Sequence, residues 1–210
     1  FWAMAEECGM AEMLEGGLAF RSVEAFAALR DAGVNIPTLG INVSPRMMRD
    51  ANFAADLIAT CNMFLIDPAD VEIEVLEDVL AQGETGAAYE TISALAKAGC
   101  RVVVDDFGVG YSSLSTVSML DIKGLKLDRS LIQKCDDARV LKILTGSIAL
   151  AKSMGMNVVA EGIETASQYA TLKKLGADVC QGFLIGVPTH QDDFADWHTT
   201  YSGASQAELG

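Results

Sequence analysis

The chain has 210 residues, of which 50% are hydrophobic and 21% are charged, and its formal net charge at pH 7 is −14. This composition allows a packed core and excludes a disordered chain, the negative charge disfavours a DNA-binding surface, and no apolar run reaches the ~18 residues that a membrane-spanning helix needs. The five cysteines are scattered and form no CxxC pair, which indicates free thiols in a cytoplasmic protein and not a disulfide framework or a zinc site.

Short β-branched runs alternate along the chain with longer segments of helical periodicity. The predicted strands are, in chain order, Thr38–Val43, Val71–Val75, Arg101–Asp105, Gly124–Leu127, Asn157–Ala160 and Asp178–Leu184. A glycine that can cap a helix C-terminus follows each of the predicted helices, which are Gly17–Ala32, Glu84–Ala98, Asp137–Met154 and Thr165–Leu175. Repetition of helix, buried strand and polar loop predicts an α/β fold with a parallel sheet. We expect residues 1–201 to form one domain and residues 202–210 a disordered tail.

Polar side chains at the ends of the predicted strands favour a (β/α) barrel over a doubly wound sheet. In strand order these side chains belong to Asn42, Glu74, Glu77, Asp105, Asp106, Lys126, Asp128, Glu161, Glu164 and Gln181. A barrel gathers its active site at the C-terminal ends of many strands, whereas an open sheet binds its ligands at one switch point. Because nearly every predicted strand ends in a polar group, the sequence predicts a TIM-like barrel.

Asp105 and Asp106 are adjacent carboxylates at the end of the apolar run RVVV. Neighbouring strand residues point to opposite faces, but a twist at the strand end would let both carboxylates reach one rim. Two such charges do not both ionise at close range without a cation, and a pair of divalent ions ~3.5–4 Å apart would share them. Oxygen ligands suit Mg²⁺ or Mn²⁺. The alternative, which the dipeptide alone favours equally, is that one aspartate caps a turn and the other is solvated.

Three further charged residues each have a catalytic and a structural interpretation. Glu74 lies in the largely apolar strand VEIEVL, where a metal ion or a lysine would satisfy its charge. Lys126 lies among apolar neighbours in GLKLD and needs an anion, either a phosphate or an acidic side chain. Glu161 ends a buried strand, so it is a metal ligand, a base, or an acid that complements a helix dipole.

Three polar residues are weaker candidates when each is taken alone. Asn42 is a turn former before Ser44 and Pro45 or a metal ligand, and Glu77 is a solvated loop acid or part of the site. Gln181 is a hydrogen-bonded interior amide or a site residue. The order of all these residues along the chain is more specific than any one of them.

The chain resembles the EAL domain family of cyclic di-GMP phosphodiesterases. The matching segments follow the family's order along nearly the whole chain: AEECG, INVSPR, the ExxE of Glu74 to Glu77, DDFGVGYSSL, LKLDRS, VVAEGIET and QGFLIGVP. The resemblance implies a TIM-like barrel that holds two Mg²⁺ or Mn²⁺ ions and hydrolyses one phosphodiester bond of cyclic di-GMP to give linear pGpG. It also implies a homodimer and, in the parent protein, upstream regulatory or GGDEF-type domains.

The resemblance also implies roles for individual residues. By motif match, the metal ligands would be Asn42, Glu74, Asp105 and Asp106, with Asp105 bridging the two ions. Glu161 would act as general base or hold the catalytic water, and Lys126 would orient that water. Gln181 and Glu164 would support the site, and Glu77 would anchor the loop from Asp105 to Leu114, which in this family joins metal binding to dimerisation.

The chain departs from the family at two places. Val109 stands where the family usually has threonine, and the name-giving Glu-Ala-Leu segment, which in the family precedes FWAMAEECG, is absent from these 210 residues. We therefore expect a barrel without its first two strands and without one metal ligand, in a fragment or in a chain that lost the segment. Two main hypotheses follow. The first is a phosphodiesterase domain, which the otherwise complete set of acids favours for the parent protein. The second is a degenerate EAL domain that binds cyclic di-GMP or a protein partner without hydrolysis, which the missing glutamate favours for this chain taken alone. A third is a Mg²⁺-dependent barrel enzyme for another phosphate ester.

Overall fold

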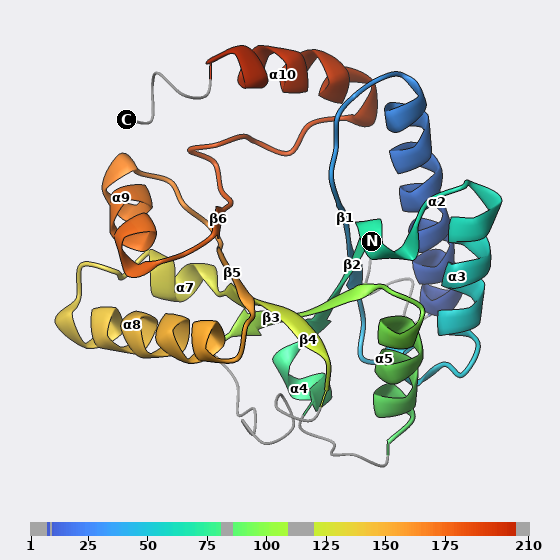
Figure 1. The fold of residues 1–210 in the computed structure, drawn as a ribbon, viewed down its shortest axis with the longest axis horizontal. Helices are drawn as coiled ribbons and strands as arrows, with labels where there is room; N and C mark the ends of the chain where they lie inside the picture. The colour runs from blue at the N-terminus through green and yellow to red at the C-terminus, as the bar shows by residue number, and fades with distance from the viewer. Residues whose placement is uncertain (1–7, 9, 81–85, 109–119, 205–210) are drawn as a thin grey trace.

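The computed structural model describes residues 8, 10–80, 86–108 and 120–204. Within these residues, one curled sheet of parallel strands follows the order of the sequence (Figure 1). The strands are β1 (Leu39–Val43), β2 (Val71–Leu76), β3 (Arg101–Phe107), β4 (Ile122–Leu127), β5 (Asn157–Ala160) and β6 (Val179–Cys180). Neighbours along the chain pair in the sheet, and in the described part β1 and β6 remain its two edges. The arrangement is a half-barrel of the TIM type, which confirms the predicted fold class.

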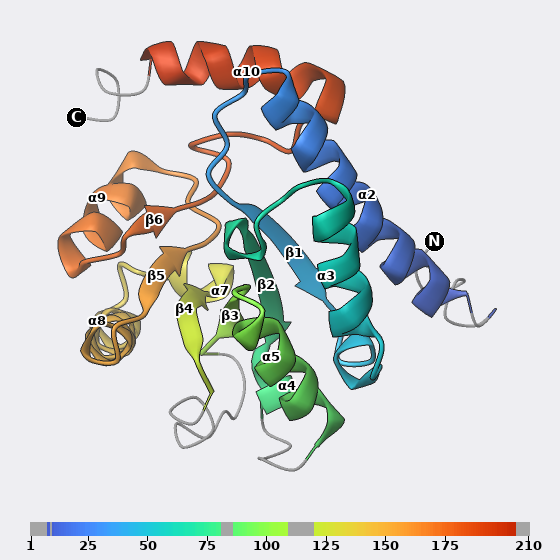
Figure 2. The same cartoon turned by 45° about the vertical axis from the view of Figure 1, so that its right-hand side comes forward.

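Helices surround the outside of this curled sheet (Figure 2). They are α2 (Ala11–Asp31), α3 (Phe53–Met63), α4 (Glu77–Leu80), α5 (Ala87–Lys97), α7 (Arg129–Ile132), α8 (Ala138–Ser153), α9 (Ala166–Leu175) and α10 (Gln191–Ala204), with the 3₁₀ turns η1 (Met47–Arg49) and η2 (Pro68–Asp70). In both views α2 and α3 lie side by side next to β1, α8 and α9 lie beside β5, and α10 runs across the top of the molecule.

The core lies between the sheet and the helices because the strands alternate in burial. In β2, Val71, Ile73 and Val75 are fully buried, whereas the intervening Glu72 and Glu74 keep 16% and 12% of their side chains exposed. Such a period of two places alternate side chains on opposite faces of a sheet. The helices complete the core with fully buried aliphatic side chains such as Leu95, Leu144 and Ile148. The face of the sheet opposite this core is therefore free to carry polar groups.

The four predicted helices are present as α2, α5, α8 and α9, and the four glycines expected to cap them have positive φ angles. Two helix starts differ from the predicted ones by more than one residue, and of these α5 begins at Ala87 and not at Glu84. Helix α2 begins at Ala11 and not at Gly17, since it continues through two glycines, and residues 84 and 85 of the predicted second helix lie outside the described residues. Helices α3 and α10 were not predicted. In α3 the buried residues Phe53, Leu57 and Cys61 recur every four positions, a helical spacing hidden by apolar residues between them.

The last predicted strand, Asp178–Leu184, is wrong in length, because β6 ends at Cys180. Gly182 has a φ of +154° and its backbone packs so closely on β5's continuation that a Cβ atom there would lie 2.2 Å from the Ile163 carbonyl oxygen. The chain then turns, with Ile185 and Gly186 both donating to the Gly182 carbonyl. Gln181 thus follows the strand, and the prediction that it lies in the middle of the strand is wrong.

At the C-terminus, α10 continues to Ala204, three residues into the segment predicted to be disordered, and residues 205–210 lie outside the described part. None of the helices described combines the length and the apolar character that crossing a membrane requires. All five cysteines are free thiols, as predicted.

Candidate active site and metal centre

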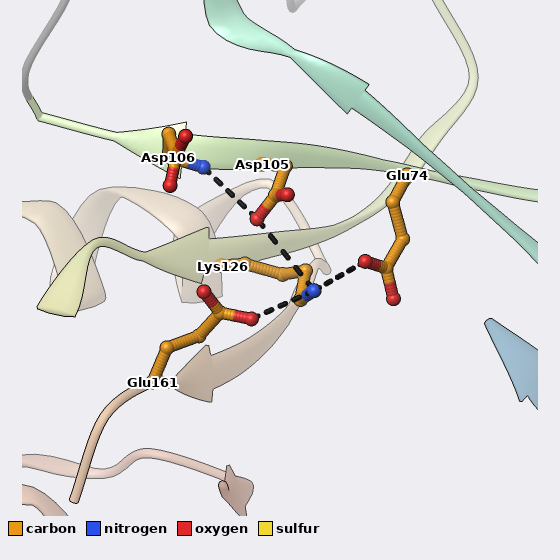
Figure 3. Close-up of polar contacts among 5 residues, drawn as sticks. All are labelled: Glu74, Asp105, Asp106, Lys126 and Glu161. Carbon is orange, nitrogen blue, oxygen red and sulfur yellow. Dashed lines mark hydrogen bonds and ion pairs between the residues drawn. The ribbon is translucent and has the colours of Figure 1, made fainter. Parts of the chain in front are cut away.

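The candidate site lies at the C-terminal ends of β2, β3, β4 and β5, on the face of the sheet opposite the core (Figure 3). Glu74 comes from β2, Asp105 and Asp106 from β3, and Lys126 from β4. Glu161 directly follows β5, and its N–H donates to the Leu127 carbonyl at 3.2 Å, which extends the β4–β5 pairing by one residue. Parallel pairing brings these strand ends to one rim, as the sequence analysis predicted.

Asp105 and Asp106 share one rim because β3 is irregular where it ends. The register between β3 and β4 shifts between Val104 and Phe107, and Asp106 has a left-handed φ of +53°. The Asp106 N–H donates to Asp105 Oδ1 at 3.0 Å. A left-handed non-glycine residue costs about 1–3 kcal/mol and is typical of functional sites. A β-bulge, and not the strand twist that we expected, therefore brings the two carboxylates together.

Lys126 lies at the centre of the carboxylates, with 5% of its side chain exposed. Its Nζ contacts Glu74 Oε2 at 2.5 Å, Glu161 Oε1 at 2.7 Å and, more distantly, Asp105 Oδ1 at 3.6 Å (Figure 3). The anion that the sequence required for this lysine is thus supplied by acidic side chains from neighbouring strands. Because Lys126 forms close contacts with Glu74 and Glu161 and a longer ion pair with Asp105, it fixes the relative positions of these carboxylates.

The electrostatics of the site indicate an excess of negative charge. Burial is the main reason why the pKa of Glu74 and that of Glu161 lie above their ordinary value, and Asp105 raises both further, against the opposing effect of Lys126. The pKa of Asp106 is also raised, by burial and then by Asp105. Burial alone would lower the pKa of Lys126, but Glu161 and Glu74 outweigh it and keep the pKa above its ordinary value. Lys126 therefore stays charged and cannot neutralise four carboxyl groups.

The carboxylates fit a divalent cation. Within the described residues, oxygen atoms of Asp105, Asp106 and Glu161 lie within 4.8 Å of one another. An oxygen-only set of this kind suits hard cations such as Mg²⁺ or Mn²⁺. The surplus negative charge and the raised pKa values give the physical reason, since a cation would remove the repulsion that protonation otherwise relieves.

Asn42 and Glu74 border the same site from β1 and β2. The two residues are directly paired in the register of the strands. Both line a cavity of about 480 Å³ that Asp105 also lines. Glu74 joins the carboxylate group through Lys126, whereas Asn42 is exposed and lies at the border of the cavity. The structure thus brings the four predicted metal ligands to one side of the sheet.

Glu77 holds the end of β3 in place. Glu77 is the first residue of α4 and is buried. Its carboxylate accepts a hydrogen bond from the Gly108 N–H at 3.0 Å. Gly108 lies two residues after Asp106, so this bond ties the start of the predicted loop to β2. The rest of that loop, including Val109 and Leu114, lies outside the described residues.

Glu164 and Gln181 lie outside the carboxylate cluster. Glu164 Oε1 pairs with Arg129 Nη2 at 2.6 Å, and both side chains are partly exposed. The Gln181 N–H donates to the Ala160 carbonyl, and the Gln181 carbonyl accepts from the Ile163 N–H. Gln181 also lines a separate cavity between β6 and α10. Both therefore flank the site through the segments that follow β5 and β6.

Several residues near the site were not given roles by sequence reasoning. Asp128 caps α7 by accepting from the Ser130 N–H at 2.9 Å, and its carboxyl group also raises the pKa of Asp106. On the cavity wall, Ser44 Oγ donates to Glu15 Oε2 at 2.9 Å. The segment LKLDRS contains Asp128 two residues after the predicted lysine, and this closeness to a buried charge was the available signal.

A half-barrel of parallel strands whose C-terminal ends gather carboxylates around a buried lysine defines a (β/α)-barrel protein with an acidic site whose oxygen atoms suit a cation. The EAL domain profile matches residues 1–188. The chain belongs to the EAL domain family.

Two curated relatives and one solved structure illustrate the match. The chain is 30% identical over 202 residues to the cyclic di-GMP phosphodiesterase PdeR of Escherichia coli K12, and this match covers 96% of the chain and 30% of the relative. It is 31% identical over 160 residues to the cyclic di-GMP phosphodiesterase RocR of Pseudomonas aeruginosa, covering 76% of the chain and 41% of the relative. The PaMucR phosphodiesterase in complex with c-di-GMP superposes with a TM-score of 0.86 at 26% identity, over 92% of this chain and 78% of that one. The chain thus spans less than half the length of either curated relative.

Proposed function

We propose that this chain is a metal-dependent phosphodiesterase domain that hydrolyses one phosphodiester bond of cyclic di-GMP to give linear pGpG. The observation that carries the proposal is the grouping of Asp105, Asp106 and Glu161 oxygens within 4.8 Å, beside the Lys126 ammonium. The substrate is inferred from the relatives, since PdeR and RocR are named cyclic di-GMP phosphodiesterases and PaMucR was solved with c-di-GMP.

We assign four residues as ligands of two Mg²⁺ or Mn²⁺ ions, namely Asn42, Glu74, Asp105 and Asp106. Such ions would offset the negative charge of the phosphate and would lower the pKa of a bound water, which makes that water a better nucleophile. The position of Asp105 at the bulge, in contact with Asp106 on one side and Lys126 on the other, supports its role as the shared ligand.

Glu161 is the residue suited to accept the proton of the attacking water. Burial raises the pKa of its carboxyl group toward neutrality, which makes the carboxylate a stronger base. The contact with Lys126 at 2.7 Å keeps one carboxylate oxygen fixed and leaves the other for the water. Lys126 also remains positively charged, so it offsets negative charge that develops on the phosphate.

Glu77, Glu164 and Gln181 support these groups from outside. Glu77 holds the end of β3 through Gly108, and Glu164 and Gln181 belong to the segments that follow β5 and β6. Partners of this kind keep reacting groups in position without touching the reacting atoms.

The test measures conversion of cyclic di-GMP to pGpG by the complete gene product with Mn²⁺ or Mg²⁺. Glu161→Gln should lower kcat at least about 100-fold, because it removes the base, while calorimetric titration should show that cyclic di-GMP still binds. Glu90→Gln, an exposed substitution on α5, is the matched control and should leave both quantities unchanged.

Three outcomes would count against the proposal. Absence of Mn²⁺-dependent turnover in the parent protein contradicts the activity. Binding of cyclic di-GMP without turnover identifies a binding module instead. Near-parental turnover in Glu161→Gln shows that another group serves as the base.

A further inference from the structure

Arg129 joins three segments at the mouth of the site, although it contacts none of the four carboxylates around Lys126 within the described residues. Its guanidinium pairs with Glu164 Oε1 at 2.6 Å, in the turn that follows β5. The same group lies 6.0 Å from the ring centre of Phe183, in the segment that follows β6. When the Gln133 side-chain amide is oriented with its oxygen toward Arg129, Gln133 Oε1 accepts a hydrogen bond from Arg129 Nε at 2.6 Å.

The aliphatic stem of Arg129 packs directly on the backbone of the turn after β5. A Cβ atom at Gly162 would lie 2.3 Å from Arg129 Cγ, and Gly162 has a φ of +68°. A glycine is required there both for the left-handed conformation and for the close approach. Arg129 therefore contacts this turn at two points: its aliphatic stem packs on Gly162, and its guanidinium pairs with Glu164.

Glu161 is the residue immediately before Gly162, so the position of its carboxylate depends on this turn. The Glu161 N–H is held by the Leu127 carbonyl at 3.2 Å. Two residues further, the Ile163 N–H donates to the Gln181 carbonyl, and the Leu184 N–H donates to the Ile163 carbonyl, both at 3.0 Å. The turn and the segment after β6 thus form one hydrogen-bonded unit, and Arg129 contacts both parts of it.

We propose that Arg129 is a positioning residue, which locks the turn from Glu161 to Glu164 against the segment after β6 and thereby sets the direction of the Glu161 carboxylate. The proposal rests on the proposed function, in which Glu161 is the base. Its physical basis is that the Arg129 and Glu164 side chains are 54% and 38% exposed, so their ion pair contributes little to global stability. A contact that contributes little to stability but fixes a catalytic turn should affect chemistry far more than folding.

The experiment compares the unsubstituted parent protein with three variants, namely Arg129→Ala, Arg129→Lys and Arg139→Ala. Hydrogen exchange and turnover of cyclic di-GMP are measured for each. Arg139 is the matched control, because it is an exposed arginine on α8 away from the turn. Exchange is followed at the amides of residues 161–164 and 181–184 and, for comparison, at those of β3. Melting temperature is recorded for each variant.

In Arg129→Ala we expect exchange in the two segments to accelerate about tenfold or more, with β3 unchanged. We expect kcat to fall about 10- to 100-fold while KM stays within about threefold, as for other outer partners of catalytic groups. Arg129→Lys should recover part of both effects, since it keeps a cation for Glu164 but loses the planar guanidinium. Arg139→Ala should match the parent protein.

The proposal is overturned if exchange in the two segments of Arg129→Ala equals that of Arg139→Ala. A rise in KM with unchanged kcat also overturns it, because Arg129 would then contact the substrate. Faster exchange with unaltered turnover shows that the turn does not direct Glu161. If the parent protein does not turn over cyclic di-GMP, the proposed function fails, and the exchange measurement alone decides whether Arg129 locks the turn.

Discussion

Replacing Lys126 by methionine removes the positive charge at the centre of the site while keeping an unbranched side chain of similar length. The ammonium is 5% exposed and contacts Glu74 at 2.5 Å and Glu161 at 2.7 Å. Removing one partner of a buried ion pair leaves the other charge uncompensated and costs about 3–5 kcal/mol. We expect Lys126→Met to lower the free energy of unfolding of the metal-free protein by that amount at pH 7.

Protonation of the two glutamates limits this loss and makes it depend on pH. The ordinary pKa of a glutamate carboxyl is 4.5, which is 2.5 units below pH 7, so keeping one carboxyl protonated at pH 7 requires about 3.4 kcal/mol at 1.36 kcal/mol per unit. At pH 5 the same step requires only about 0.7 kcal/mol. The loss caused by Lys126→Met should therefore fall below about 1.5 kcal/mol at pH 5.

Urea unfolding of the metal-free protein at pH 7 and pH 5 measures both values. Lys123→Met is the control on the same strand, because Lys123 pairs with Asp121 at an exposed position and should contribute no more than about 1 kcal/mol. A loss below 1 kcal/mol at pH 7, or a loss that is equal at both pH values, would refute the view that Lys126 compensates buried carboxylates.

Three other changes test the site and its supports. Millimolar Mn²⁺ should raise the melting temperature more at pH 7 than at pH 5, because protons compete with the ion for carboxyl groups whose pKa values are raised. The raised pKa values also make the metal-free fold lose stability as pH rises above about 4.5. Equal shifts in circular dichroism melts would count against this site. Gly182→Ala should lower the free energy of unfolding by about 2–4 kcal/mol, since the new Cβ atom would meet the Ile163 carbonyl. Gly146→Ala, in the open interior of α8, should instead raise the free energy of unfolding by about 0.5–1 kcal/mol. Comparable urea midpoints for the two variants would contradict the packing described. Glu77→Ala should weaken Mn²⁺ binding about 10- to 100-fold in calorimetry, because it releases the Gly108 N–H. Glu77→Gln keeps a hydrogen-bond acceptor and should weaken Mn²⁺ binding less. Unchanged Mn²⁺ affinity in the alanine variant would show that Glu77 does not support the site.

Local patterns of the sequence were sufficient to predict most of the sheet. The strands β1 to β5 are apolar runs bounded by glycines and polar turns, and the helices between them show a period near 3.6. Buried charges were equally informative, because a lysine or a glutamate inside an apolar strand requires a partner wherever the fold places it. Lys126 and Glu74 are each other's partners in the structure. Where polarity does not alternate, as in α3, or where glycines interrupt a helix, as in α2, the local pattern was not sufficient.

Only the tertiary structure decided how the site is assembled. The left-handed conformation of Asp106 depends on the register shift between β3 and β4, and no local pattern in RVVVDDF specifies it. The end of β6 depends on the approach of Gly182 to Ile163, and the place of Arg129 depends on Glu164 and Phe183, which are 35 and 54 residues further along the chain. Periodicity and turn chemistry act over a few residues, so the sequence by itself determines which elements form and which charges need partners. Distances between side chains on different strands are set by register and curvature of the whole sheet, which is why only the fold shows which partner each charge finds.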